Sequence, residues 1–331
     1  MILLAHDIPM TSSFDDEFWS VAMNGRDEHL LLQDDSDDFD VTSCENIVRT
    51  ITTLAPDPDL HPLVLRLCLN SKHGCLSDVS GDIWDASLLM AAFLYGTNEG
   101  QQLCYNACFG EAQVDGGGIL ELGSGLGLSG MAAAAAAAAA FHNTDVDNER
   151  ISRVVLTDLD DSNILAQLNK NVESNLSEIF PSREIEASFE RNRSCVFSFG
   201  RNRGRSSISM SVQSCNWSHV GKSRENADSQ LSPKGTFNLI IGSALIYVPD
   251  HAVACAEAVS HYLCRGSCSS SQAIIIQLPD RAGFDIFLRR CHELDLLVST
   301  RAVTEEIMLS VERKIVSASD YRIYCITPRN N

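Results

Sequence analysis

The sequence predicts an α/β fold built on a largely parallel sheet whose last strand is antiparallel. Three observations predict it. From residue 119 onward, short apolar runs alternate with helical patterns, which is typical of parallel strands joined by crossover helices. A glycine-dense turn at 123–130 connects an apolar run directly to a helix. Near the end of the chain, the last two strand candidates are too close together for the helical crossover that a parallel pair needs.

The glycine turn contains the strongest local signal. Ile119, Leu120 and Leu122 form a buried-type strand before it, and the unbroken alanines 132–140 follow it. Alanine has the highest helix propensity of all residues, so the segment is predicted to be strand, turn and helix. This junction brings backbone N–H groups and a helix N-terminus close to a polar ligand. It therefore predicts a nucleotide-type cofactor.

The remaining elements follow from the same two patterns. Short apolar runs indicate strands, and apolar residues spaced three or four apart indicate helices. We expect strands at 154–158, 208–212, 237–242, 273–278, 301–309 and 321–326, and helices at 164–175, 251–263 and 284–293. A further helix is expected before the glycine turn, capped by Asp82 or Asp85.

Composition shifts divide the chain into three parts. Residues 1–45 are acidic and predicted to be weakly structured, and residues 46–80 contain short strands or turns broken by prolines. Residues 81–331 form the main domain, interrupted by polar segments near 177–207 and 218–235 that we interpret as inserted loops.

Charge and composition exclude several classes of function. The formal net charge of −19 argues against general nucleic-acid binding, which requires a basic face. No apolar run approaches the length of a membrane span, and the beginning of the sequence does not resemble a signal peptide. The twelve cysteines lack metal-type spacing, so we expect free thiols in a reducing cytoplasm and no metal site. The acidic segment is either solvated or a docking surface for a basic protein.

The glycines alone fit two cofactors. Gly125, Gly127 and Gly130 match the G-x-G-x-x-G fingerprint of dinucleotide-binding proteins. Gly123, Gly125 and Gly127, with Glu121 before them, equally match the E-x-G-x-G-x-G loop of S-adenosylmethionine (SAM) methyltransferases. Asp158 ends the next predicted strand, where an acid can accept hydrogen bonds from ribose hydroxyls. Both classes of enzyme share this acid, so the choice between NAD and SAM stays open on these residues.

Five segments in a fixed order favour SAM. They are Ile83–Ser87, Ile119–Gly125, Leu156–Leu159, Cys215–Trp217 and Ile241–Tyr247. Together they resemble the seven-strand protein lysine methyltransferases of family 16, in particular the methyltransferase-like 21 group. The resemblance covers roughly residues 80–328. It implies a Rossmann-like, seven-strand SAM methyltransferase sheet with an antiparallel last strand.

The resemblance also implies roles for the matching positions. Trp84 would lie against the cofactor, Asp158 would hold the ribose, and Tyr247 would line the channel for the acceptor side chain. The remaining cofactor positions would be Glu121, Gly123, Ser124, Gly125, Trp217 and Ser243. We name no catalytic base, because methyl transfer requires mainly alignment of the reactants. A lysine acceptor can lose its proton in a desolvated channel.

The chain departs from the family pattern at one position. Ala244 stands where the family carries an Asp or Glu, three residues before the aromatic residue Tyr247. An acid there would orient a lysine ammonium group, so its replacement makes a catalytically weak or inactive SAM-fold binding module the first alternative. An NAD-dependent oxidoreductase is the second. We expect a cytoplasmic methyltransferase that modifies a protein, possibly a basic one. Its oligomeric state is left open.

Overall fold

In the computed structural model the description covers residues 48–58, 60–69, 83–110, 117–142, 151–180, 188–189, 194–199, 206–220, 234–265, 271–311, 315 and 318–329. Internal contacts divide the chain into Met1–Glu45 and Asn46–Asn331, and the description concerns the second unit. The predicted weak structure of residues 1–45 lies outside the described residues.

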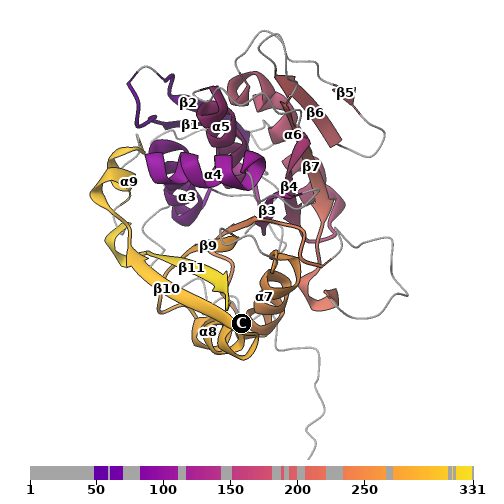
Figure 1. The fold of residues 1–331 in the computed structure, drawn as a ribbon, viewed down its shortest axis with the longest axis vertical. Helices are drawn as coiled ribbons and strands as arrows, with labels where there is room; N and C mark the ends of the chain where they lie inside the picture. The colour runs from indigo at the N-terminus through magenta and orange to yellow at the C-terminus, as the bar shows by residue number, and fades with distance from the viewer. Residues whose placement is uncertain are drawn as a thin grey trace, which may run out of the picture. The chain divides into compact units, whose positions relative to one another are not determined.

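A mixed sheet forms the centre of the described part, in the order β10-β11-β9-β8-β3-β4-β7-β6-β5 (Figure 1). Strands β9, β8, β3, β4 and β7 are parallel neighbours. β11 is antiparallel to both β9 and β10. The strands are β3 (Gly118–Leu122), β4 (Ile151–Asp158), β5 (Ser188–Phe189), β6 (Ser194–Phe199), β7 (Ser206–Ser214), β8 (Leu239–Ser243), β9 (Gln272–Gln277), β10 (Leu296–Ala302) and β11 (Arg322–Pro328). The strands from β10 to β7 confirm the predicted Rossmann-like seven-strand arrangement with an antiparallel last strand, and β6 and β5 are added beyond β7.

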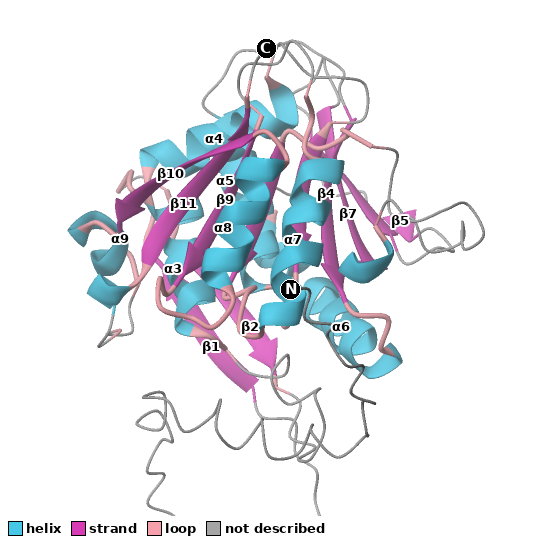
Figure 2. Ribbon diagram, turned by 90° about the horizontal axis from the view of Figure 1, so that it is seen from below, coloured by secondary structure: helices cyan, strands magenta, loops and turns pink. Residues whose placement is uncertain are grey.

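Helices cover both faces of the sheet. Apolar residues of α3, α4, α5 and α6 pack in one core on one face, and those of α7 and α8 pack in a second core on the other (Figure 2). The helices are α3 (Asp85–Gly96), α4 (Asn98–Phe109), α5 (Leu128–His142), α6 (Ser162–Ile179), α7 (Pro249–Tyr262), α8 (Phe284–Glu293) and α9 (Glu305–Leu309), with 3₁₀ turns η2 (Trp217–His219) and η4 (Ala318–Asp320). The alanines 132–138 of α5 are buried. Their small side chains allow α3 and α4 to pack closely against α5.

Two expectations about elements need correction. The predicted strand 301–309 is wrong, because β10 ends at Ala302 and residues 305–309 form helix α9. Thr304 caps this helix by accepting a hydrogen bond from the Ile307 N–H (3.5 Å), and a threonine cap followed by acids is a helix-start signal. In the segment 177–207, expected as a loop, the described residues instead end α6 and form β5 and β6, which extend the sheet beyond β7.

The short strands expected in 46–80 are confirmed. β1 (Val48–Thr53) and β2 (Leu63–Cys68) form a separate antiparallel pair. Buried leucines of β2 belong to the same core as α3 and α5. The pair β1 and β2 therefore packs on the face of the sheet that α3 to α6 cover.

Candidate cofactor-binding site

The strand order fixes where a ligand can bind. β4 lies on one side of β3 and β8 on the other, and all three run parallel. Along the chain β3 leads to its neighbour β4, and β8 leads to β9, its neighbour on the side away from β3. The connections after β3 and β8 therefore leave in opposite directions. In open α/β sheets such a reversal opens a crevice at the carboxyl ends of the strands. The glycine turn, Asp158 and Ser243 all lie at these ends.

The glycine turn adopts backbone conformations that favour glycine. Gly123, Gly125 and Gly127 have φ angles of 60°, 52° and 85°, in the left-handed region that residues with a Cβ rarely adopt. A Cβ at Gly123 would lie 2.9 Å from Leu245 Cδ2 and 3.5 Å from the Trp217 ring. The turn is therefore tightly packed from the side of β8 and η2.

Ser124 anchors the turn to the neighbouring strand. Its N–H donates to the Thr157 carbonyl (2.8 Å), and its hydroxyl oxygen accepts from the Thr157 N–H (2.9 Å). The Ser124 side chain is 7% exposed. Its role here is to join the turn to β4.

Asp158 points toward the glycine turn. Its carboxylate accepts hydrogen bonds from the N–H groups of Gly125 (2.7 Å) and Leu159 (2.8 Å). A carboxylate has about four lone-pair positions, so these two bonds leave acceptor capacity for the hydroxyls of a ribose. Burial raises the pKa of Asp158, and the two N–H groups oppose that rise. The free acceptor capacity of Asp158 therefore fits a nucleoside ligand.

Glu121 faces the start of helix α5. Its carboxylate is 1% exposed and accepts from the Gly130 N–H at 3.0 Å. Burial raises its pKa to about 8, although hydrogen bonds from Ser124, Ser129 and Gly130 lower it. The structure thus shows Glu121 bracing the turn against the helix N-terminus. A direct bond to the cofactor stays a prediction.

Trp217 and Ser243 lie beside the glycine turn, and Trp84 lies beside another loop. The Trp217 ring packs against Gly123, and the Ser243 hydroxyl is 3.4 Å from that of Ser129 at the beginning of α5. Trp84 precedes α3, where the Arg281 guanidinium lies 6.0 Å from its ring centre. The described contacts therefore connect Trp84 to the loop after β9.

Tyr247 lies on the segment between β8 and α7. Its ring meets the His251 ring edge-on, with 5.4 Å between the centroids, and His251 also lies edge-on to Trp217 at 6.2 Å. Burial raises the pKa of Tyr247, and the charge of Asp158 raises it further. Burial lowers the pKa of His251, while Asp250 opposes that change. A neutral phenol and a neutral imidazole therefore border the predicted channel near pH 7.

Ala244 has a backbone conformation that is unusual for alanine. Its φ angle is 52°, and Asn, Asp and Gly are the residues that tolerate this region best. Its N–H donates to the Ile276 carbonyl at 3.0 Å. The position therefore has a backbone suited to an acid but carries a methyl group.

Sequence reasoning missed several residues around this site. Gln277 and Arg281 end or follow β9, and His251 lies one turn beyond Tyr247. Leu159 directly follows Asp158 and is 48% exposed. The place of Leu159 after the strand-end acid can be recognised in the sequence, whereas its exposure cannot. The contacts of His251 and Gln277 depend on segments far apart in the chain.

The described residues contain neither a metal cluster nor a membrane-spanning helix. Among them, no group of three or more His, Cys, Asp or Glu side chains could hold a metal ion. No described helix combines the length and the apolar character needed to cross a membrane.

Comparison with protein families gives a match within the chain. Residues 66–188 match the family model described as lysine methyltransferase. The matched segment contains Trp84, the glycine turn and Asp158, and it ends before Trp217 and Tyr247. A comparison with curated proteins gives no match.

Comparison with solved structures finds similar chains at low identity. A methyltransferase from Pyrococcus furiosus is 15% identical, with 66% of this chain and 78% of that chain covered and a TM-score of 0.31. A geranyl diphosphate C-methyltransferase from Streptomyces coelicolor, solved with S-adenosyl-L-homocysteine, is 10% identical over 68% and 76%, with a TM-score of 0.33. Phospholethanolamine N-methyltransferase 2 of Haemonchus contortus is 9% identical over 86% and 69%, with a TM-score of 0.35.

The family match and the site geometry agree on the cofactor. The match includes the glycine turn and the acid of β4, and the structure joins these two by the bond from Gly125 to Asp158. Together they support S-adenosyl-L-methionine as the cofactor and methyl transfer as the reaction. The narrower methyltransferase-like 21 group stays a prediction.

Proposed function

We propose that this chain transfers a methyl group from SAM to a lysine side chain of a protein. The observation that carries the proposal is the match of residues 66–188 to the lysine methyltransferase model. The match covers Trp84, the glycine turn and Asp158, and it stops before the cofactor positions Trp217 and Ser243 and before Tyr247. The cofactor therefore has more support than the lysine acceptor. The acceptor is supported by the family description and by the position of Tyr247.

The residues of the chain hold and orient the reactants in this proposal. SAM supplies an activated methyl group on a sulfonium sulfur. Asp158 binds the ribose hydroxyls, the glycine turn leaves space for the rest of the cofactor, and Trp217 borders it from the side of η2. Tyr247 borders the acceptor, whose amine must lie in line with the methyl group. Alignment of this kind supplies much of the rate.

A lysine acceptor must lose its proton before attack. Its unperturbed pKa is about 10.4, and a half-buried channel beside a cation lowers that value. Burial lowers the pKa of His251 and keeps its imidazole neutral, so desolvation and the charge of the sulfonium are left to lower the pKa of the lysine.

Transfer to a protein can be tested directly. The purified chain is incubated with methyl-labelled SAM and cell lysate, and the labelled residue is identified by mass spectrometry. We expect label on lysine, and we expect less label with Asp158→Ala at SAM concentrations that do not saturate the variant. Label confined to another residue type would contradict the lysine assignment. Tight NAD binding without S-adenosyl-L-homocysteine binding in calorimetry would contradict methyl transfer itself.

Ala244 favours a second candidate, a SAM-fold binding module with little activity. Its methyl group cannot attract an ammonium ion, and its φ of 52° suits aspartate. We expect Ala244→Asp to increase lysine methylation roughly tenfold if the missing carboxylate limits the rate, the scale of one charged hydrogen bond. Ala244→Gly is the matched control, since it removes the backbone strain without adding charge. No methylation with any of the three chains would favour the binding module.

The partner and the compartment remain proposals as well. The net charge of −19 favours a basic protein partner, because opposite charges steer association. The cytoplasm is proposed as the compartment because the twelve cysteines lack metal-type spacing and fit free thiols in a reducing environment. We expect methylation to slow as salt rises from 0.05 M to 0.3 M. A rate independent of salt would contradict charge steering, and a fluorescent fusion would test the compartment.

A further inference from the structure

Gln277 is a buried amide at the carboxyl end of β9. It is 1% exposed, and its side chain bonds the backbone of Ile246 in both directions. Its Nε2 donates to the Ile246 carbonyl at 2.7 Å, and its Oε1 accepts from the Ile246 N–H at 3.3 Å. The amide therefore pairs with Ile246 as a neighbouring strand would.

The segment that Gln277 holds lies between regular elements. β8 ends at Ser243 and α7 begins at Pro249. The residues between them therefore lie outside the regular hydrogen bonding of a strand or a helix. Ala244 begins this segment in the left-handed region, and Ile246 is fully buried. Buried backbone groups need hydrogen-bond partners, and Gln277 supplies both for Ile246.

Tyr247 follows Ile246 directly. Its ring contacts His251, which also contacts Trp217. The far end of the segment is confined too, because a Cβ at Gly283 would lie 2.5 Å from Pro249 Cα. The loop after β9 and the end of β9 thus fix the segment at Pro249 and at Ile246.

We propose that Gln277 is a positioning residue that sets the place of Tyr247 at the acceptor channel. It acts through the paired bonds to Ile246 and does not contact the cofactor or the reacting atoms. The proposal rests on the proposed function, since it takes Tyr247 to border the acceptor.

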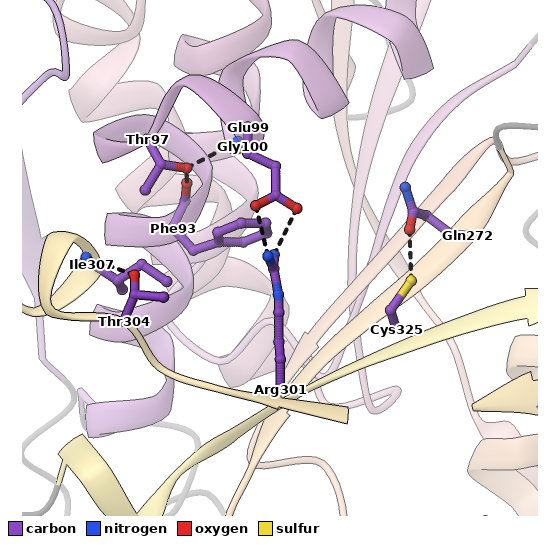
Figure 3. Close-up of polar contacts among 9 residues, drawn as sticks. All are labelled: Phe93, Thr97, Glu99, Gly100, Gln272, Arg301, Thr304, Ile307 and Cys325. Atoms are coloured by element: carbon purple, nitrogen blue, oxygen red, sulfur yellow. Dashed lines mark hydrogen bonds and ion pairs between the residues drawn. The ribbon is translucent and has the colours of Figure 1, made fainter. Parts of the chain in front are cut away.

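The test replaces Gln277 by a side chain of similar shape without its hydrogen bonds. Gln277→Met is compared with Gln272→Met, which changes the same residue type at the other end of β9, where Gln272 accepts from the Cys325 thiol at 2.7 Å (Figure 3). We expect Gln277→Met to speed deuterium exchange in 244–248 and to slow labelled methyl transfer roughly tenfold to hundredfold. The Kd for S-adenosyl-L-homocysteine should change less than threefold, and Gln272→Met should change none of the three.

A double variant separates positioning from general destabilisation. On a Tyr247→Ala background, Gln277→Met should cause no further loss of transfer, because residues that act through one another are not additive. Additive losses, or equal loss of S-adenosyl-L-homocysteine affinity, would overturn the proposal.

The wild-type chain gives a test that needs neither a folded variant nor an acceptor. Its Ile246 amide should exchange slowly although it lies outside helix and strand. Fast exchange would overturn the role of Gln277. Slow exchange with no methyl transfer from the wild type would count against the proposed function alone.

Discussion

At the scale of single residues, the two buried carboxylates beside the glycine turn have different hydrogen-bond partners. Asp158 accepts from the glycine turn and keeps room for a ligand, whereas Glu121 accepts from the first turn of α5. Both are buried beside each other, and the charge of Asp158 raises the pKa of Glu121. Their different partners lead to different predictions.

Replacing Asp158 should weaken cofactor binding. Asp158→Ala removes the acceptor for the ribose and for the Gly125 N–H, and we expect a loss of ~1–3 kcal/mol in the free energy of binding. Calorimetry with S-adenosyl-L-homocysteine measures it. Asp160→Ala, at an exposed acid two residues further on, is the control and should leave the affinity unchanged. Equal affinities for both variants would remove Asp158 from the site.

Replacing Glu121 should change how stability depends on pH. Its pKa of about 8 lies above the ordinary value of 4.5, so the folded chain binds this proton more tightly than the unfolded chain. The contribution of Glu121 to the free energy of unfolding is full below about pH 4.5 and is lost as pH rises toward 8. Glu121→Gln lacks this loss.

Thermal unfolding without ligand measures the effect. The melting temperature of Glu121→Gln, relative to that of the wild type, should be higher at pH 8 than at pH 5. The other titrating groups are common to both chains and largely cancel. A difference that does not vary with pH would contradict the burial of an ionisable Glu121.

At the scale of elements, side-chain amides of α6 hold the edge of β2. Asn175 accepts from the Arg66 N–H (2.7 Å) and donates to the Arg66 carbonyl (2.9 Å), and Asn171 accepts from the Cys68 N–H (2.9 Å). Four residues of helix span about 6 Å and two residues of strand about 6.6 Å. The i, i+4 spacing of the two asparagines therefore matches the i, i+2 spacing of the strand.

Breaking one of these amide pairs should loosen β1 and β2. Asn175→Leu leaves both backbone groups of Arg66 without this partner, and we expect a loss of ~1–3 kcal/mol in the free energy of unfolding. Asn169→Leu is the control on the same helix, because among the described residues Asn169 bonds locally, to the Leu165 carbonyl. Urea unfolding compares the two, and equal effects would contradict a specific role for Asn175.

An ion pair joins β10 to α4 at the other end of the sheet. Arg301 makes two bonds of 2.7 Å to Glu99 and lies 5.1 Å from the Phe93 ring centre (Figure 3). The side chains are 41% and 61% exposed, so water and salt screen the pair. We expect Glu99→Gln to cost at most ~1 kcal/mol, and less at high salt. A larger loss in urea unfolding that salt does not reduce would contradict this.

At the scale of the whole molecule, the last strand in the chain, β11, occupies an inner position of the sheet. It lies between β9 and β10, and its Ile323 and Ile326 are fully buried in the two different cores. A chain stopped after Asp320 should therefore fail to fold, whereas one stopped after Arg329 should melt cooperatively. Circular dichroism and melting compare them. Native-like melting of the shorter chain would show that β11 is dispensable.

The fold class could be predicted from the chain alone, because hydrophobic periodicity and the glycine turn are local signals. The sequence also located the acid of β4, since strand ends can be recognised along the chain. The prediction of a strand at 301–309 was wrong because Thr304, a helix cap followed by two acids, ends the extended segment and begins α9.

Only the tertiary structure decided which residues surround the site. The pairing of Gln277 with Ile246, the contact of His251 with Tyr247 and the orientation of Glu121 toward α5 join segments that parallel crossovers bring together. Nothing local to Gln277 distinguishes it from Gln272 on the same strand. Hydrogen-bond partners across a sheet depend on strand order and register, which a single sequence does not display. The sequence therefore indicated the cofactor, whereas the contacts around Tyr247 follow from the fold.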